Sequence, residues 1–133
     1  MKQIKYLKES EGISKPSDLF NNIKSIDIDY NQENLILFYL DTKNKVIKSE
    51  ILFKGGLNSC SIDPKTIFRN ALINNSNSII IAHNHPSGDL KPSNEDINVF
   101  KDLVKIGDII SLKVLDSIIF NKKEFYSINE EML

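Results

Sequence analysis

Apolar residues in this chain gather in short runs that polar turns separate. Residues 34–40 (NLILFYL) are nearly all apolar, which is typical of a central strand covered on both faces. Residues 46–53 alternate loosely after the turn residues 41–44, so these two segments are expected to form a hairpin. A second continuous apolar run, residues 78–82, predicts another buried strand.

Three other segments have the spacing of amphipathic helices. The first is predicted to begin at Ser17. The second opens at Asp63, an N-cap acid that a proline follows, and closes in an Asn-rich stretch. The third follows the N-cap residue Ser93 and is predicted to run to about Ile106, with Gly107 as its C-terminal stop.

Residues 109–115, 117–120 and 125–128 predict further short strands. Hairpins therefore outnumber crossover units, which favours an α+β fold with a mixed, mostly antiparallel sheet flanked by helices. The first residues are polar and mixed, and we interpret residues 1–16 as an N-terminal arm and residues 17–133 as one domain. A chain of 133 residues has the length of a single domain.

The formal net charge is −1, and basic residues are scattered among acidic ones. Nucleic-acid binding usually requires several cations close together, so charge does not support a nucleic-acid partner. The lone Cys60 excludes an intramolecular disulfide and a cysteine-based zinc site. No signal-peptide pattern opens the chain and no apolar run approaches the length of a membrane span, so we expect a cytoplasmic protein without a membrane partner.

The chain has two histidines, His83 and His85, and both follow the apolar run 78–82. Residues i and i+2 of a strand project to the same face, so both imidazoles would enter one space at the strand end. Two imidazoles on one face indicate a metal site.

Asp96 is expected to supply a third ligand from the first turn of the helix that Ser93 begins. Two imidazole nitrogens and one carboxylate oxygen would leave the fourth position of a tetrahedral Zn²⁺ ion open for water, which is typical of catalytic sites. Ser93 and Asp96 could instead form a plain capping box without metal, and the two histidines could be structural. Both histidines of the chain lie on one face at a strand end, and a turn-rich loop and a capped helix follow them. This combination favours the metal site.

The pattern H-x-H-P, six residues, S, two residues, D resembles the metal signature of the JAB/MPN metallopeptidases, also called the JAMM motif. His83, His85, Pro86, Ser93 and Asp96 match it at every spacing. The strings HNHPSGD, LDTKN and FKGGLNS are similar to the RadC branch of that superfamily. The resemblance covers about residues 17–133 and implies a JAB/MPN-like fold with one zinc ion per chain.

The resemblance also implies roles for particular residues. Glu33 stands eight residues before Asp41, as a family glutamate does, and is expected to act as general base and then general acid. Ser93 is expected to cap the helix and to hydrogen-bond the oxyanion of the tetrahedral intermediate. Glu50 and Glu95 are competing candidates for the base.

The reaction that follows is zinc-dependent hydrolysis of a peptide or isopeptide bond in a protein or peptide substrate. Two alternatives stay open at this point. The chain could be a catalytically silent protein-binding module of the same fold, or a protein associated with DNA repair.

Overall fold

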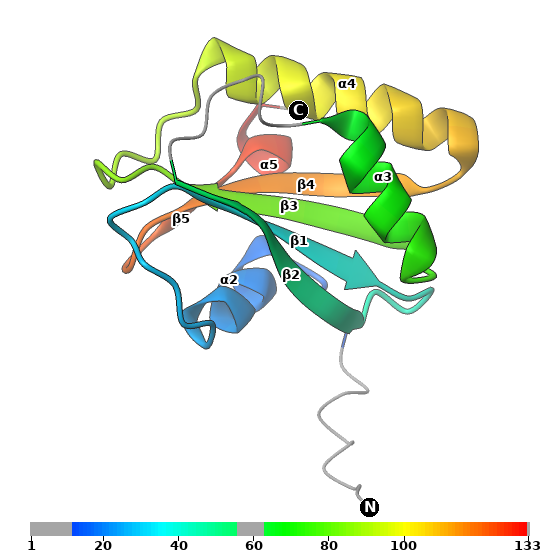
Figure 1. The fold of residues 1–133 in the computed structure, drawn as a ribbon, viewed down its shortest axis with the longest axis horizontal. Coiled ribbons are helices and arrows are strands. Elements are labelled where there is room, and N and C mark those ends of the chain that lie inside the picture. The colour runs from blue at the N-terminus through cyan, green and yellow to red at the C-terminus, as the bar shows by residue number, and fades with distance from the viewer. Residues whose placement is uncertain (1–11, 56–62, 133) are drawn as a thin grey trace, which may run out of the picture.

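The computed structural model describes residues 12–55 and 63–132, so most of the predicted N-terminal arm and Cys60 lie outside the described residues. The strands are β1 (Asn34–Leu40), β2 (Val46–Lys54), β3 (Ser78–Asn84), β4 (Lys113–Phe120) and β5 (Phe125–Ser127). The helices are α2 (Pro16–Lys24), α3 (Pro64–Ile73), α4 (Asn94–Ile110) and α5 (Ile128–Met132). The strands form one sheet in the order β2-β1-β3-β4-β5, with helices on both faces (Figure 1).

The sheet confirms the predicted α+β class. All neighbouring strands pair antiparallel except β3 and β4, which are parallel. The predicted hairpin is β1 and β2, and every residue of β1 and β3 is buried, as their continuous apolar runs predict. These two strands are therefore the centre of the fold.

Side chains of the central strands alternate between two apolar layers. Leu35, Leu37 and Ile81 pack on the side of α3 and α4, whereas Ile36 and Ile80 pack on the side of α2. Figure 1 shows α2 below the sheet and α3, α4 and α5 above it. Because full burial of one such side chain contributes about 1.5–3 kcal/mol, both layers hold the sheet in place.

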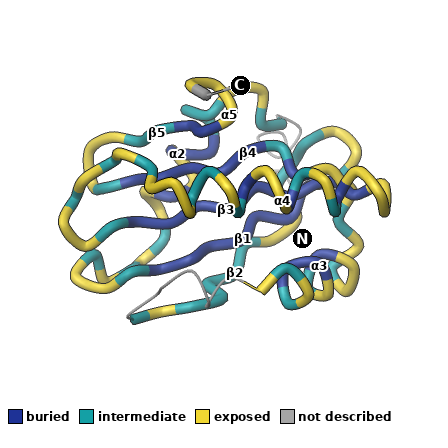
Figure 2. The backbone as a smooth tube through the Cα atoms, turned by 90° about the horizontal axis from the view of Figure 1, so that it is seen from above, coloured by how far each residue is buried: buried dark blue, intermediate teal, exposed yellow. Residues whose placement is uncertain are grey.

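Helix α4 connects the parallel pair, since parallel neighbours require a crossover. It runs back over the sheet, and its outer side is exposed while the strands beneath it are buried (Figure 2). The crossover begins at the end of the sheet where β3 stops. The N-terminus of α4 therefore lies close to the last residues of β3.

The predicted end of this helix at Gly107 is wrong, because α4 continues to Ile110 and ends on Ser111, whose φ is 59°. A Cβ on Gly107 would lie 2.3 Å from the carbonyl oxygen of Leu112. Glycine is required here because the chain returns closely over the helix, and not because the helix stops.

The predicted strands 109–115 and 117–120 are also wrong in their bounds. Ile109 and Ile110 are exposed residues of α4, and Lys113–Phe120 is one strand that includes the buried Asp116. Its hydrogen-bonded carboxylate allows an apolar strand to continue through a charged position. Strand β5 ends at Ser127, since Ile128 already begins α5.

Among the described residues, no helix combines the length and the apolar character that a membrane crossing requires.

Candidate metal centre

The sheet brings the predicted ligands to one end of the molecule, at the left in Figure 1. Strand β3 ends with His83 and Asn84, and His85 follows directly. Antiparallel pairing sets Leu35 of β1 opposite His83, so the segment that enters β1 lies beside the end of β3. The first turn of α4 adds Asp96 from above.

The three predicted ligands lie within reach of one ion. His83 Nε2 is 3.3 Å from Asp96 Oδ1, and His85 Nε2 is 3.4 Å from Asp96 Oδ2. One donor atom from each residue can be chosen so that all three lie within 4.8 Å of one another. Ligand atoms about 2.05 Å from a tetrahedral zinc ion are roughly 3.3 Å apart, which is the spacing between each imidazole nitrogen and the Asp96 oxygen that it contacts.

The surroundings of the buried His83 ring support a metal site. The residue is 5% exposed, and among the described residues its Nδ1 has no hydrogen-bond partner, while its Nε2 has the 3.3 Å contact with Asp96 but no well-aligned hydrogen bond. Buried polar atoms almost always have a partner, because an unpaired one loses its hydration without compensation. A metal on Nε2 would satisfy that nitrogen.

His85 is oriented by the backbone. Its Nδ1 lies 2.7 Å from the carbonyl oxygen of Asp89, so Nδ1 carries the proton and donates it. Because Nδ1 is engaged by the backbone, Nε2 is the nitrogen that faces Asp96, and such a backbone bond is the usual support of a metal-binding imidazole.

Asp96 and His85 each shift the pKa of the other so that the charged form is favoured. Burial disfavours the ionised form of Asp96, but contacts with His83 and His85 and the Ser93 amide hold the pKa of its carboxyl well below the usual range. The Asp96 carboxylate in turn raises the pKa of His85 against desolvation, and the Asp89 carbonyl and the charge of Glu33 act in the same direction. Asp96 is therefore ionised at neutral pH.

The capping box that competed with the metal hypothesis is present together with the ligand set. Ser93 Oγ accepts a hydrogen bond from the Asp96 amide at 3.0 Å, and Asp96 Oδ2 accepts one from the Ser93 amide at 2.8 Å. The box fixes the carboxylate against the helix start. The capping box is therefore compatible with a metal site, because it leaves the carboxylate facing the two imidazoles.

Glu33 lies in the turn that enters β1, and its side chain is half-buried. Its carboxylate is close enough to His85 for its charge to contribute to the raised pKa of that ring. The amide of Gly55, at the end of β2, donates to the Glu33 carbonyl at 3.0 Å. Glu33 therefore lies at the same end of the sheet as the two histidines, next to Asn34, which Asn84 contacts.

Asn84 holds the backbone that carries Glu33. Its Oδ1 accepts from the Asn34 amide at 2.9 Å, and its Nδ2 donates to the Gln32 carbonyl at 2.9 Å. Strand alternation predicts that Asn84 points away from the two histidines. No local pattern identifies its hydrogen-bond partners, which lie 50 residues earlier in the chain. The sequence thus predicts the direction in which Asn84 points, whereas its hydrogen-bond partners are known only from the fold.

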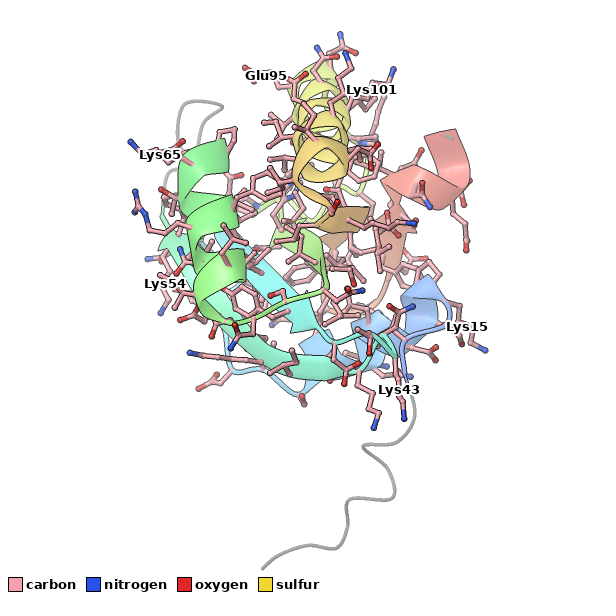
Figure 3. The ribbon with its side chains drawn as sticks, turned by 90° about the vertical axis from the view of Figure 1, so that its right-hand side faces the viewer. Lys15, Lys43, Lys54, Lys65, Glu95 and Lys101 are labelled. Atoms are coloured by element: carbon pink, nitrogen blue, oxygen red, sulfur yellow. The ribbon has the colours of Figure 1, made fainter. Side chains whose placement is uncertain are left out.

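The two competing glutamates lie elsewhere. Glu50 accepts from the Tyr39 hydroxyl at 2.5 Å and contacts Lys48. On β2, Glu50 is paired with Leu37 of β1. Leu37 is two residues, or ~7 Å, further along β1 than Leu35, the residue opposite His83. Glu95 is exposed on the outer side of α4 (Figure 3).

Comparison with known proteins agrees with this geometry. The family model for the RadC-like JAB domain matches residues 13–133. A UPF0758 protein of Clostridium perfringens is 46% identical over 119 residues, which are 90% of this chain and 52% of that protein. UPF0758 proteins of Staphylococcus haemolyticus and Methanosarcina mazei are 43% and 39% identical over equal lengths. The chain spans about half the length of the curated relatives it matches.

Proposed function

The chain belongs to the family of RadC-like JAB domains, and from this premise we propose that it is a zinc-dependent hydrolase of peptide or isopeptide bonds. The observation that carries the proposal is the cluster of His83, His85 and Asp96, in which buried imidazole nitrogens face an ionised carboxylate. Three such donors leave one tetrahedral position for solvent, as in catalytic zinc sites.

A zinc ion at this cluster would polarise the substrate carbonyl and lower the pKa of water toward neutrality. Glu33 is the proposed general base, since its charge acts on His85 and its carboxylate is not part of the ligand cluster. It would accept the proton of the attacking water and return it to the leaving amine. Asn84 would keep Glu33 in place through the backbone on either side of it.

Ser93 can cap the helix and assist the reaction together. Its Oγ uses a lone pair to accept from the Asp96 amide, which leaves the hydroxyl hydrogen free. The side chain is exposed at the start of α4. Its hydroxyl could therefore donate to an oxyanion that develops next to the ligand cluster.

The test combines metal content with hydrolysis. The wild-type chain should retain about one zinc ion per chain by plasma mass spectrometry and should cleave members of a mixed-sequence peptide library, with products identified by mass spectrometry. Glu33→Gln should keep the metal and lose cleavage by a factor of about 10²–10⁴. Glu50→Gln is the matched control and should keep both.

Wild-type protein that binds no zinc would overturn the proposed site. Loss of cleavage in Glu50→Gln, with Glu33→Gln fully active, would move the base to β2. Stoichiometric zinc with no cleavage of any library peptide would exclude a peptidase, and the same result with lysine isopeptides would favour the silent binding module.

A further inference from the structure

A pocket with a volume of about 330 Å³ adjoins the His83, His85 and Asp96 cluster, and His85 forms part of the pocket wall. The rest of the wall comes from the segment before Glu33, the loop after His85 and the turn between β4 and β5. The lining residues are Tyr30, Asn31, His85, Pro86, Gly88, Asn121, Lys122, Lys123 and Glu124. The pocket therefore borders both the ligand loop and the segment that leads to the proposed base.

The turn between β4 and β5 is fixed to the ligand loop by one side chain. Asn121 Nδ2 donates to the carbonyl oxygen of Gly88 at 2.9 Å. Its Oδ1 accepts from the amides of Lys123 and Glu124 at 2.8 and 2.7 Å. The backbone of Lys122 and Lys123 is thus held at a set position relative to His85.

Tyr30 also lines the pocket and is itself held in place. Its ring packs edge-on against Phe120, with centroids 5.9 Å apart, and Lys122 Nζ lies 5.6 Å from the centre of the Tyr30 ring. A cation over an aromatic face is attracted to it, which keeps the ammonium group at the pocket. Burial raises the pKa of Tyr30, so its hydroxyl stays protonated and can donate a hydrogen bond.

The pocket carries more positive than negative charge, since it includes two lysines and one glutamate. Its volume is at the lower end of the range for ligand sites, so it suits a side chain or a chain terminus. The scattered charges of the chain do not extend this basic character into a track for a nucleic-acid backbone. A single anionic group next to the scissile bond fits these features.

We propose, on the basis of the hydrolase function above, that this pocket binds a substrate carboxylate close to the bond that is cleaved. Lys122 and Lys123 supply the positive charge, and Tyr30 supplies a hydrogen-bond donor. The carboxylate belongs either to an acidic side chain or to the C-terminus of a peptide. The protein is thereby a hydrolase with a preference for anionic substrates.

The experiment uses hydroxamates, because this group binds a catalytic zinc ion independently of the pocket. Calorimetry on the zinc-loaded chain compares N-acetylglutamate and N-acetylglutamine α-hydroxamates for the side-chain carboxylate. A second pair is malonyl-alanine hydroxamate with the malonyl carboxylate either free or converted to an amide. This pair tests the terminal carboxylate. In at least one pair, the acid should bind about fivefold more tightly than the neutral analogue, as expected for weak ion pairs in an open pocket.

The double substitution Lys122→Ala/Lys123→Ala should abolish this preference and leave the affinity for acetohydroxamate unchanged. The control, Lys65→Ala/Lys101→Ala, removes the same charge from exposed positions on α3 and α4 and should keep the preference (Figure 3). Equal affinity for acid and neutral analogues in both pairs would overturn the proposal, as would a preference that survives in Lys122→Ala/Lys123→Ala.

Two further outcomes separate the causes of failure. Absence of acetohydroxamate binding would mean that the metal site itself is wrong, and the proposed function would fail together with the pocket. Binding of octathymidylate that depends on Lys122 and Lys123, without a preference for the acids, would identify a phosphate site and refute the carboxylate proposal.

Discussion

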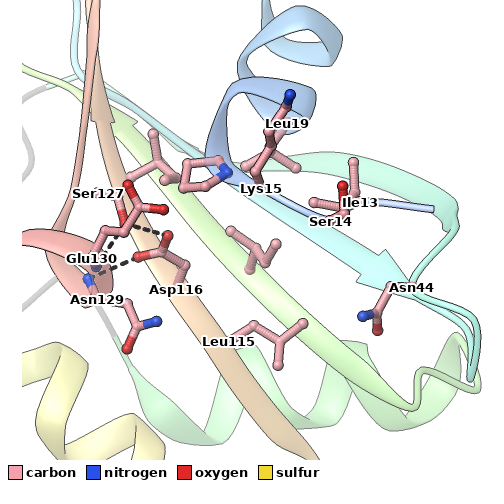
Figure 4. Close-up of a pocket in the computed structure, with 13 residues that line it drawn as sticks. Ile13, Ser14, Lys15, Leu19, Asn44, Leu115, Asp116, Ser127, Asn129 and Glu130 are labelled. Atoms are coloured by element: carbon pink, nitrogen blue, oxygen red, sulfur yellow. Dashed lines mark hydrogen bonds between the residues drawn. The ribbon is translucent and has the colours of Figure 1, made fainter. Parts of the chain in front are cut away.

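Asp96 and Asp116 are largely buried aspartates on opposite faces of the same sheet, and their carboxylates contact different chemical groups. The oxygens of Asp96 face two imidazoles on the α4 side. Asp116 lies on the α2 side, in the wall of a pocket of about 250 Å³ (Figure 4). Its oxygens accept hydrogen bonds from Ser127 Oγ at 2.6 Å, the Ser117 amide at 2.7 Å and the Asn129 amide at 3.0 Å.

The pKa of the two carboxyls moves in opposite directions. Burial raises the pKa of Asp116 despite its three donors, whereas the histidines and the Ser93 amide hold the pKa of Asp96 low despite burial. Asp116 is satisfied by the chain's own donors and ties β4 to the start of α5. Asp96 instead faces two imidazole nitrogens, the donor type of a zinc site, and this is why we propose it as a metal ligand and Asp116 as a structural carboxylate.

The largest expected difference between the two aspartates is in metal affinity. Asp96→Asn keeps an acceptor for the Ser93 amide but replaces the anionic ligand, so zinc affinity should fall by ~1000-fold, more than the loss typical of residues behind the ligands. Competition with a fluorescent chelator measures it. Asp116→Asn removes one charge from the other face and should bind zinc normally; equal losses in both variants would contradict the distinction.

The next effect is on stability and concerns Asp116. Asp116→Ala leaves the Ser127 hydroxyl and two amides without their acceptor, so the free energy of unfolding should fall by about 3 kcal/mol. Urea titration followed by circular dichroism measures it, with zinc content unchanged in the folded protein. A variant as stable as the wild type would show that the three hydrogen bonds contribute nothing.

A smaller effect is expected at the helix start that supports Asp96. Ser93→Ala removes the N-cap acceptor of α4 and should lower the free energy of unfolding by about 1 kcal/mol in urea titration. Zinc should still bind, because the three ligands remain. Ser93→Thr keeps the hydroxyl and should restore most of the lost stability; loss of zinc in Ser93→Ala would make the cap essential to the metal site.

The smallest effect is the pH dependence of stability from Asp116. Its pKa in the folded protein is raised above the ordinary value of 3.8, so the folded state holds the proton more tightly than the unfolded state. The stability that this group contributes is therefore greatest below pH 3.8 and decreases as the pH rises through its folded pKa. Unfolding curves of wild type and Asp116→Asn between pH 3 and 7 should converge at the acidic end, and a difference that grows toward acid would refute this sign.

Much of the fold follows from local patterns in the sequence. Continuous apolar runs predicted β1 and β3, and the Asp63 cap with its proline predicted the start of α3, where Asp63 accepts from the Lys65 amide at 3.0 Å. Errors arose where one residue type serves two purposes. Gly107 was interpreted as a helix stop, although it permits close packing, and the apolar residues Ile109 and Ile110 belong to an exposed helix end.

The sequence by itself determined the types of the proposed ligands, their spacing and the alternation that turns His83 and His85 to one face. Only the tertiary structure decided that α4 returns over the sheet to bring Asp96 within 3.4 Å of both rings. It also decided that Asn84 grips the segment of Glu33, and that Lys122 stands over Tyr30. These contacts depend on which strands are neighbours and on where a crossover begins, and such long-range pairing leaves no local trace in the order of residues.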